Sequence, residues 1–253
     1  MSTKRTSKLT IVNDSHIAPP PPPRSTNTLR LKLDSLKTFT PLTDNQKIFF
    51  DAYKRGDYFV ALHGVAGTGK TFIACYKALE EVLDKNNNFN KIIIVRSAVQ
   101  SREMGHLPGD VNDKLDIYQQ PYRQICHTLF DRKDAYDRLV EQGYIEFIST
   151  SFIRGMSFDD AIIIVDEIQN MNFEEIDTVM TRVGYRSKII WCGDYRQTDL
   201  RKNGDRSGIL KFFDIAHHMN AFTRVEFTVD DIVRSSLVKD YIIAKLKYED
   251  LVQ

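Results

Sequence analysis

The fold of this chain is decided by the stretch His63-Gly64-Val65-Ala66-Gly67-Thr68-Gly69-Lys70-Thr71, which follows an apolar run and precedes a helical pattern. It contains G-x-x-x-x-G-K-T, whose glycines allow positive φ and a close approach of the backbone to a phosphate. Backbone N–H groups at the helix start then surround the anion, Lys70 adds positive charge, and Thr71 offers a hydroxyl to Mg²⁺. The alternative is a flexible glycine turn, which so many constrained positions argue against. We predict that a nucleotide is bound by Gly64, Val65, Ala66, Gly67, Thr68, Gly69, Lys70, Thr71 and Phe72.

A second apolar run, Ala161–Val165, ends in the carboxylates of Asp166 and Glu167. A buried parallel strand delivers its last residues to the carboxyl edge of the sheet, beside the phosphate loop. Asp166 is predicted to complete the Mg²⁺ shell with Thr71, through water, because Mg²⁺ keeps several waters. Glu167 is predicted to orient and deprotonate the attacking water. The two motifs together indicate a nucleoside triphosphate and Mg²⁺ as cofactors, and the alternative for the carboxylates is a polar strand end before a turn.

The segments around these motifs alternate between strand and helix. Runs with little polar alternation, at residues 92–95, 162–165 and 188–191, are typical of parallel strands covered by helices on both faces. The predicted fold is therefore α/β, a doubly wound, mainly parallel sheet flanked by helices. Strands are predicted at 58–63, 91–95, 144–148, 161–165, 187–192 and 222–227, and helices at 43–55, 70–83, 110–141, 173–182, 207–217 and 235–248.

The composition excludes several classes of protein. The 253 residues carry a net charge of +1, which argues against a uniformly basic nucleic-acid coat but leaves a local basic patch open. Cys75, Cys126 and Cys192 form no C-x-x-C pair, so we expect buried thiols in a reducing compartment. No secretory signal and no run of about 18 apolar residues is visible. We expect a cytoplasmic protein with no membrane contact.

The N-terminal segment differs from the rest. It is polar and contains the run Pro19–Pro23, which favours an extended chain. Residues 1–37 include seven Lys or Arg and two Asp, so a solvated tail and an electrostatic arm for nucleic acid both remain open. A short strand leading into the core is predicted from the alternation of Leu29, Leu31 and Leu33. The expected organisation is a flexible tail, residues 1–37, and a P-loop domain, residues 38–253.

From about Pro41 to Lys247 the chain resembles the PhoH family of ATPases. The family-like motifs occur in order at Gly64–Thr71, Ile92–Val99, Gly105–Asp110, Arg154-Gly155, Asp166–Asn170, Thr181–Gly184, Gly193–Leu200, Ser207-Gly208 and Asp231–Arg234. Leu107–Asp110 and Gly193–Leu200 are the most specific. The family resembles the first RecA-like half of superfamily 1 helicases, which implies a RecA-like core. The chain departs from the family pattern at Met156-Ser157, Ile168 and Ser235-Ser236.

The resemblance implies further catalytic roles. Gln197 looks like a γ-phosphate sensor that hydrogen-bonds both water and phosphate, and the alternative is a polar loop residue. Arg234 resembles an arginine finger, a cation that can raise the rate about 10³- to 10⁵-fold, and the alternative is a surface salt bridge. Arg96 is a second candidate for this role. The predicted catalytic set is Glu167, Lys70, Gln197 and Arg234.

Gln46 has two interpretations of equal weight. It could read the adenine edge, as upstream glutamines do in helicases, or it could complete a Thr43-x-x-Gln46 capping box at a helix start. Tyr53 and Tyr58 could stack on the base, although packing is favoured for both. Trp191 lies in an apolar run and is predicted to belong to the core.

Three functions fit these motifs. The helicase-like motifs, the basic tail and the segment after Arg96 favour ATP hydrolysis coupled to binding, translocation or unwinding of single-stranded RNA or DNA. The alternative is an ATP-controlled oligomeric switch that acts on a protein partner, with the proline run as a docking segment. A small-molecule kinase is disfavoured, because it does not require the Gln197 and Arg234 motifs. Since the chain carries one nucleotide-binding lobe, Arg234 is expected to complete a neighbour's site in a hexameric ring.

Overall fold

The computed structural model describes residues 30–97, 111–194 and 206–252. Contacts within the chain divide it into two units, Met1–Arg30 and Leu31–Gln253. The boundary expected between residues 37 and 38 stays a prediction. The folded elements described below all belong to the second unit.

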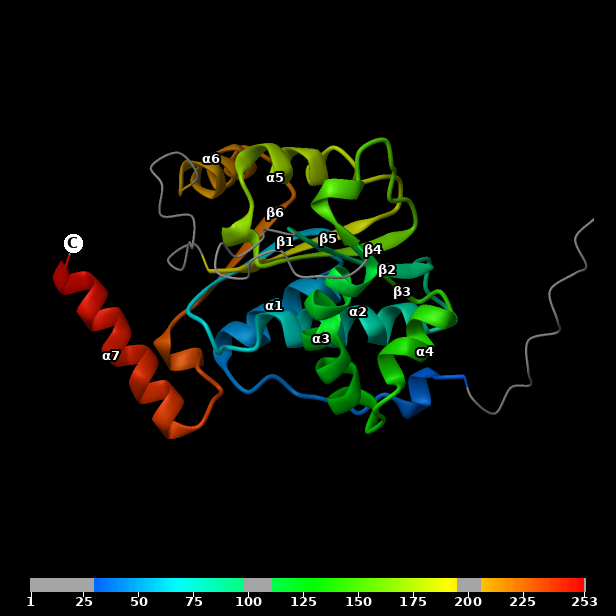
Figure 1. Cartoon of the computed structure of the whole chain (residues 1–253), viewed down its shortest axis with the longest axis horizontal. Helices are drawn as coiled ribbons and strands as arrows, with labels where there is room; N and C mark the ends of the chain where they lie inside the picture. The colour runs from blue at the N-terminus through cyan, green and yellow to red at the C-terminus, as the bar shows by residue number, and fades with distance from the viewer. Residues whose placement is uncertain (1–29, 98–110, 195–205, 253) are drawn as a thin grey trace, which may run out of the picture. The chain divides into compact units, whose positions relative to one another are not determined.

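The centre of this unit is a six-stranded sheet in which every pairing is parallel (Figure 1). The strand order is β3-β2-β4-β5-β1-β6. The strands are β1 (Phe59–Gly64), β2 (Lys91–Arg96), β3 (Ile145–Ser149), β4 (Ala161–Asp166), β5 (Lys188–Gly193) and β6 (Phe222–Phe227). All strands point the same way, so their carboxyl ends meet along one edge, which is where ligands bind in open α/β sheets.

Helices cover both faces of the sheet (Figure 1). One face carries α1 (Asp44–Arg55), α2 (Lys70–Leu83), α3 (Val111–Phe130) and α4 (Ala135–Glu141). The other face carries α5 (Phe173–Met180) and α6 (Arg206–His217), and the chain ends in α7 (Ser236–Val252). This arrangement confirms the doubly wound α/β fold predicted from the sequence. The segment predicted to be helical at 110–141 instead contains two helices, α3 and α4, and Asp131 between them has a left-handed φ of 56°.

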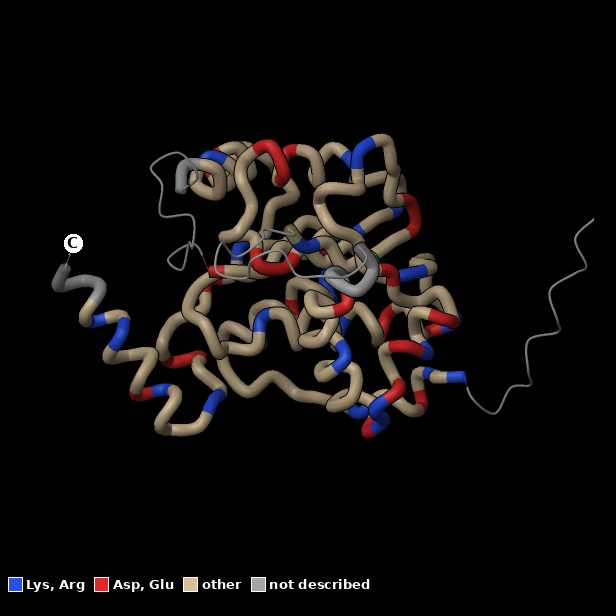
Figure 2. The backbone as a smooth tube through the Cα atoms, in the orientation of Figure 1, with Lys and Arg blue, Asp and Glu red and all other residues tan. Residues whose placement is uncertain are grey.

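The strands are apolar on both faces because each face meets a helical layer. Ile162 and Ile164 of β4 point into the core under α1–α4, whereas Ile163 and Val165 point into the core under α5 and α6. Charged residues lie mainly on the helices and connections, with both signs intermixed (Figure 2). The three cysteines are buried and free, as predicted.

The strand predicted at Leu29–Leu33 is wrong over its described residues. Leu31 is buried in the core, but the chain then forms a 3-10 helix at Leu33–Ser35. The Ser35 hydroxyl donates to the Lys32 carbonyl at 2.6 Å and accepts from the Lys32 N–H at 3.1 Å. These local bonds occupy the backbone groups that a strand would offer to a neighbour, so the apolar alternation ends in a turn.

None of the described helices combines the length and the apolar character needed to cross a membrane.

Candidate active site

The phosphate loop joins β1 to α2 at the carboxyl edge of the sheet. Gly64, Gly67 and Gly69 have φ values of 121°, 78° and 81°, which side-chain-bearing residues rarely adopt. A Cβ on Gly64 would lie 2.1 Å from the Phe227 carbonyl oxygen, which accepts the Val65 N–H at 3.0 Å. The glycine at position 64 thus has an additional cause, because the end of β6 contacts the loop there and leaves no room for a side chain.

Lys70 is buried at the start of α2. Its ammonium group donates to the Gly64 carbonyl at 2.9 Å, to the Val65 carbonyl at 2.7 Å and to the Thr68 hydroxyl at 3.3 Å. Burial lowers the pKa of Lys70, and the nearby carboxylate of Asp194 opposes that shift. The charge is therefore held inside the loop that would enclose a phosphate, in a setting where an anion would be bound strongly.

The two residues predicted to bind metal are in contact. The Thr71 hydroxyl donates to Asp166 Oδ1 at 2.7 Å, although the two residues belong to α2 and β4. Asp166 Oδ2 accepts a second bond from the hydroxyl of Tyr122 on α3, at 2.8 Å. Hydroxyl and carboxylate oxygens are the hard ligands that Mg²⁺ prefers. These residues fit a Mg²⁺ site.

The protein ligands alone would not fill a metal shell. Within residues 30–97, 111–194 and 206–252, no group of three or more His, Cys, Asp or Glu could hold a metal ion.

Glu167 has an unusual backbone conformation and an unusual environment. Its φ of 55° and ψ of 44° are left-handed, which costs a residue with a side chain about 1–2 kcal/mol. Burial raises the pKa of Glu167, and the adjacent Asp166 charge adds to the shift, whereas Arg96 opposes it. A raised pKa brings a carboxylate closer to the range in which it accepts protons from water, as a general base must.

Gln169 connects Glu167 to the next strand. Its amide nitrogen donates to Glu167 Oε2, and its amide oxygen accepts the backbone N–H of Asp194 at 3.0 Å. Asp194 follows β5, which lies between β1 and β4 in the sheet. The predicted sensor Gln197 lies outside the described residues. Residues 98–110, which include parts of the family-like motifs, lie outside them as well.

Gln46 forms only half of the predicted capping box, and both ends of its side-chain amide have hydrogen-bond partners within the chain. The Thr43 hydroxyl accepts the Gln46 N–H at 3.4 Å, which is one half of the box. The Gln46 side chain instead accepts the Leu42 N–H at 2.9 Å and donates to the Thr68 carbonyl at 3.0 Å. The side chain therefore ties the start of α1 to the phosphate loop, and a contact with adenine remains a proposal.

Arg234 lies against the phosphate loop of its own chain. The N–H of the preceding residue, Val233, donates to the Gly67 carbonyl at 3.1 Å. A Cβ on Gly67 would meet Arg234 Cγ at 3.1 Å and Ile242 Cδ1, from α7, at 3.4 Å. The second candidate, Arg96, pairs in register with Asp166 on the neighbouring strand. Both arginines are thus near the site.

A family model described as PhoH-like protein matches residues 38–245. This chain belongs to the PhoH-like protein family. PhoH-like proteins of Mycobacterium leprae and Bacillus subtilis are 35% and 36% identical to it over 229 and 209 residues, which cover 90% and 82% of this chain. Each match covers 64% of the relative, so this chain spans under two thirds of their length.

A solved structure is similar to this chain at much lower sequence identity. Unliganded Pif1 from Bacteroides sp aligns with 78% of the PhoH-like chain and 43% of that protein, at 14% identity and a TM-score of 0.40. This similarity is too low to bear on function.

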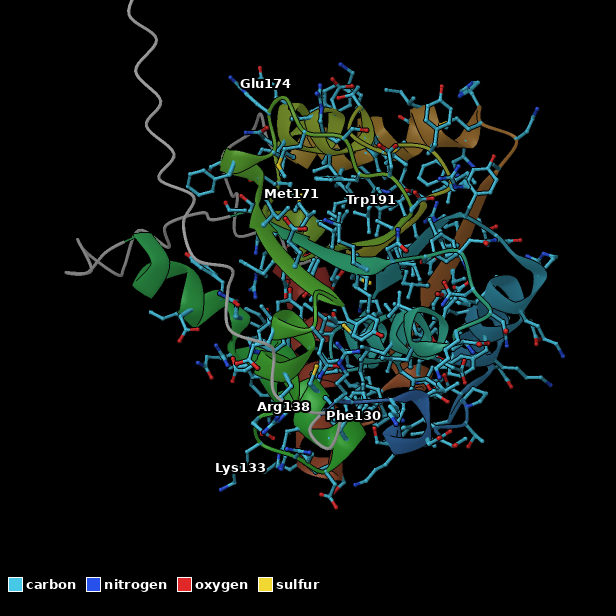
Figure 3. All side chains as sticks on the ribbon, turned by 90° about the vertical axis from the view of Figure 1, so that its right-hand side faces the viewer. Phe130, Lys133, Arg138, Met171, Glu174 and Trp191 are labelled. Atoms are coloured by element: carbon cyan, nitrogen blue, oxygen red, sulfur yellow. The ribbon has the colours of Figure 1, made fainter. Side chains whose placement is uncertain are left out.

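Of the three aromatic residues singled out in the PhoH-like chain, Trp191 and Tyr53 are buried and Tyr58 is on the surface. Trp191 is buried between the sheet and the layer of α5 and α6, with its ring centroid 4.7 Å from that of Phe212 (Figure 3). Tyr53 is buried under the ammonium group of Lys188, which lies 3.7 Å from the ring centroid. Tyr58 is exposed. Trp191 and Tyr53 are therefore packing residues.

Two residues of the site were not singled out from the sequence of this PhoH-like chain. Gln169 stands two positions after Glu167 in the quoted motif, and its amide could have indicated a partner for that carboxylate. Tyr122 gave no signal, because it is 44 positions from Asp166 within an ordinary helical pattern.

Proposed function

We propose that this PhoH-like chain binds Mg–ATP in the loop Gly64–Thr71 and hydrolyses it. The observation that carries the proposal is the 2.7 Å bond between the Thr71 hydroxyl and Asp166 Oδ1. It joins the helix after the phosphate loop to the strand that ends in two carboxylates. This juxtaposition is what nucleotide hydrolysis needs, a phosphate cradle beside a metal-binding oxygen pair and a base.

Each residue has a chemical task in this proposal. Lys70 neutralises the β and γ oxygens, and Thr71 and Asp166 hold Mg²⁺, which supplies charge neutralisation to the phosphates when bound. Glu167 takes a proton from the attacking water as the bond from the water oxygen to the γ-phosphorus forms, while the bond from that phosphorus to the oxygen bridging to the β-phosphate breaks and ADP leaves. Gln197 is proposed to align that water, and Arg234 to stabilise the charge that develops on the leaving phosphate.

The first experiment measures nucleotide binding by Lys70→Ala. Charge-assisted hydrogen bonds are worth about 1.5–3 kcal/mol, so we expect a fluorescent ATP analogue to bind about 10- to 100-fold more weakly. The matched control is Lys85→Ala, which removes the same charge from an exposed residue after α2. Equal affinities for the two variants would contradict the site.

We further propose that hydrolysis is coupled to single-stranded RNA or DNA. Support comes from the basic N-terminal segment, with seven Lys or Arg in residues 1–37 against two Asp. Backbone phosphates bind such a segment by counterion release, so binding falls with salt. The test is the rate of ATP hydrolysis with and without single-stranded oligonucleotides at several salt concentrations. Absence of both stimulation and salt-sensitive binding would reject the coupling.

The alternative is an ATP-controlled oligomeric switch that acts on a protein partner. Either function is proposed to use a homo-oligomer, with a hexameric ring as the expected form. Light scattering after gel filtration gives the oligomeric state with and without nucleotide. Partner capture that differs between the wild type and Lys70→Ala, without stimulation by nucleic acid, would favour the switch.

A further inference from the structure

Helix α3 presents two aromatic side chains to the edge of the sheet where the site lies. Tyr118 and Tyr122 are four positions apart, and residues at this spacing share one face of a helix. The guanidinium carbon of Arg96 lies 5.6 Å from the centroid of the Tyr118 ring, and the hydroxyl of Tyr122 donates to Asp166 at 2.8 Å. Arg96 and Asp166 are register partners on β2 and β4. One face of α3 thus contacts the ends of two adjacent strands.

The two oxygens of Asp166 have different partners. Oδ1 accepts from Thr71 on α2, and Oδ2 accepts from Tyr122 on α3. A carboxylate rotates about its terminal torsion with little resistance, because that torsion is broad. Two donors from two helices fix the carboxylate plane and leave Oδ1 on the side of the phosphate loop.

The environment of Tyr122 makes this contact rigid. Its side chain is 1% exposed, and its ring centroid lies 5.9 Å from that of Phe147 on β3. The hydroxyl therefore has little freedom to find another partner, and its bond restricts the orientation of the Asp166 carboxylate.

We propose that Tyr122 is a positioning residue that holds Asp166 in the orientation needed to bind the metal of a metal–nucleotide complex. This inference rests on the proposed function, since it assigns the support of the same site. Partners behind a ligand typically change metal affinity about 10- to 100-fold when they are removed. The hydroxyl of Tyr122 is expected to act through Asp166 and to touch neither nucleotide nor water.

The test compares Tyr122→Phe with Tyr136→Phe. Tyr136, on α4, is equally buried at 1%. Its hydroxyl donates at 2.9 Å to Gln119, which lies on α3 but outside the site. Both substitutions remove one buried hydroxyl and keep the ring. Mn²⁺ binding is measured by electron paramagnetic resonance, in the presence of a non-hydrolysable ATP analogue. For Tyr122→Phe we expect half-saturation at about 10- to 100-fold more Mn²⁺, with nucleotide affinity in EDTA unchanged.

The outcomes separate the inference from the function. If Tyr122→Phe binds Mn²⁺ like Tyr136→Phe and the wild type, the positioning role is wrong and the nucleotide site stands. If the wild type shows no metal-dependent nucleotide binding, both fail. Melting in EDTA checks that the variants fold.

A second measurement uses the unmodified protein. In its nuclear magnetic resonance spectrum, bound Mn²⁺ should broaden the ring resonances of Tyr122 more than those of Tyr136, and equal broadening would contradict the inference.

Discussion

At the scale of single residues, Glu167 is the group on which the proposed hydrolysis depends. Its backbone is left-handed, its side chain accepts from Gln169, and it follows Asp166 directly. An amide cannot accept the proton of water, so Glu167→Gln is expected to lower kcat about 10²- to 10⁴-fold while ATP binding persists. The measurement is steady-state turnover beside nucleotide affinity. The control is Glu174→Gln, an exposed carboxylate in the first turn of α5 (Figure 3). Normal turnover by Glu167→Gln would exclude this residue as the base.

The same residue predicts a pH dependence of activity. Burial, with the Asp166 charge beside it, raises the pKa of Glu167 above the ordinary glutamate value. The base must be ionised, so kcat/KM should fall as the pH drops through this raised pKa. The fall should begin at a higher pH than it would for an ordinary glutamate. A pH profile of kcat/KM reports the pKa of the free enzyme and checks the shift. An acid limb at or below the ordinary value contradicts it.

A buried carboxylate also affects stability. Because the folded pKa of Glu167 is raised, ionisation costs stability at a pH above that value, and the cost disappears as pH falls below the unfolded pKa. Glu167→Gln removes this cost. We expect its Tm to exceed the wild-type Tm near pH 7.5, with a smaller difference near pH 5. A Tm difference that grows toward low pH would show that another effect dominates.

At the scale of elements, the junction of β1 and β6 sets the position of the phosphate loop. Gly64 has a φ of 121°, and a Cβ there would lie 2.1 Å from the Phe227 carbonyl. Gly143 has a φ of 78° and open space around it, so it is the matched control. We expect Gly64→Ala to lower the free energy of unfolding by about 2–5 kcal/mol, against about 1–2 for Gly143→Ala. Denaturant unfolding followed by the fluorescence of Trp191 measures both, and equal losses would contradict the close approach.

The elements themselves follow from local signals, with two exceptions. The period of apolar residues predicts the strands of the sheet and the helical segments of its layers, because burial on both faces demands continuous apolar strands. It does not register the left-handed Asp131, which separates α3 from α4. The segment near Leu31 fails for a local reason, since the Ser35 hydroxyl closes a turn that apolar alternation does not register. Helix α3 was predictable as a helix, but the alignment of Tyr122 with Asp166 was not.

At the scale of the whole molecule, Arg234 has two alternative targets, the site of its own chain and the site of a neighbouring chain. Arg234 Cγ lies near the Gly67 of its own chain, so the contact within one chain opposes the expected action on a neighbour. Arg234→Ala is expected to lower kcat about 10³-fold or more. Mixing Arg234→Ala with Lys70→Ala tests the arrangement, because shared sites would pair an intact loop with an intact arginine. We expect no recovery of ATP hydrolysis, and recovery in mixed oligomers would show action between chains.

The sequence by itself determined the fold class, the phosphate loop and the carboxylate pair. Those features depend on local patterns, namely glycine spacing, apolar periodicity and the residues at strand ends. Only the tertiary structure decided that Tyr122 supports Asp166, that Gln46 bonds the phosphate loop, and that Arg234 lies on its own chain's loop. Contacts between segments far apart in the chain depend on the relative placement of packed helices and strands, which no local pattern encodes.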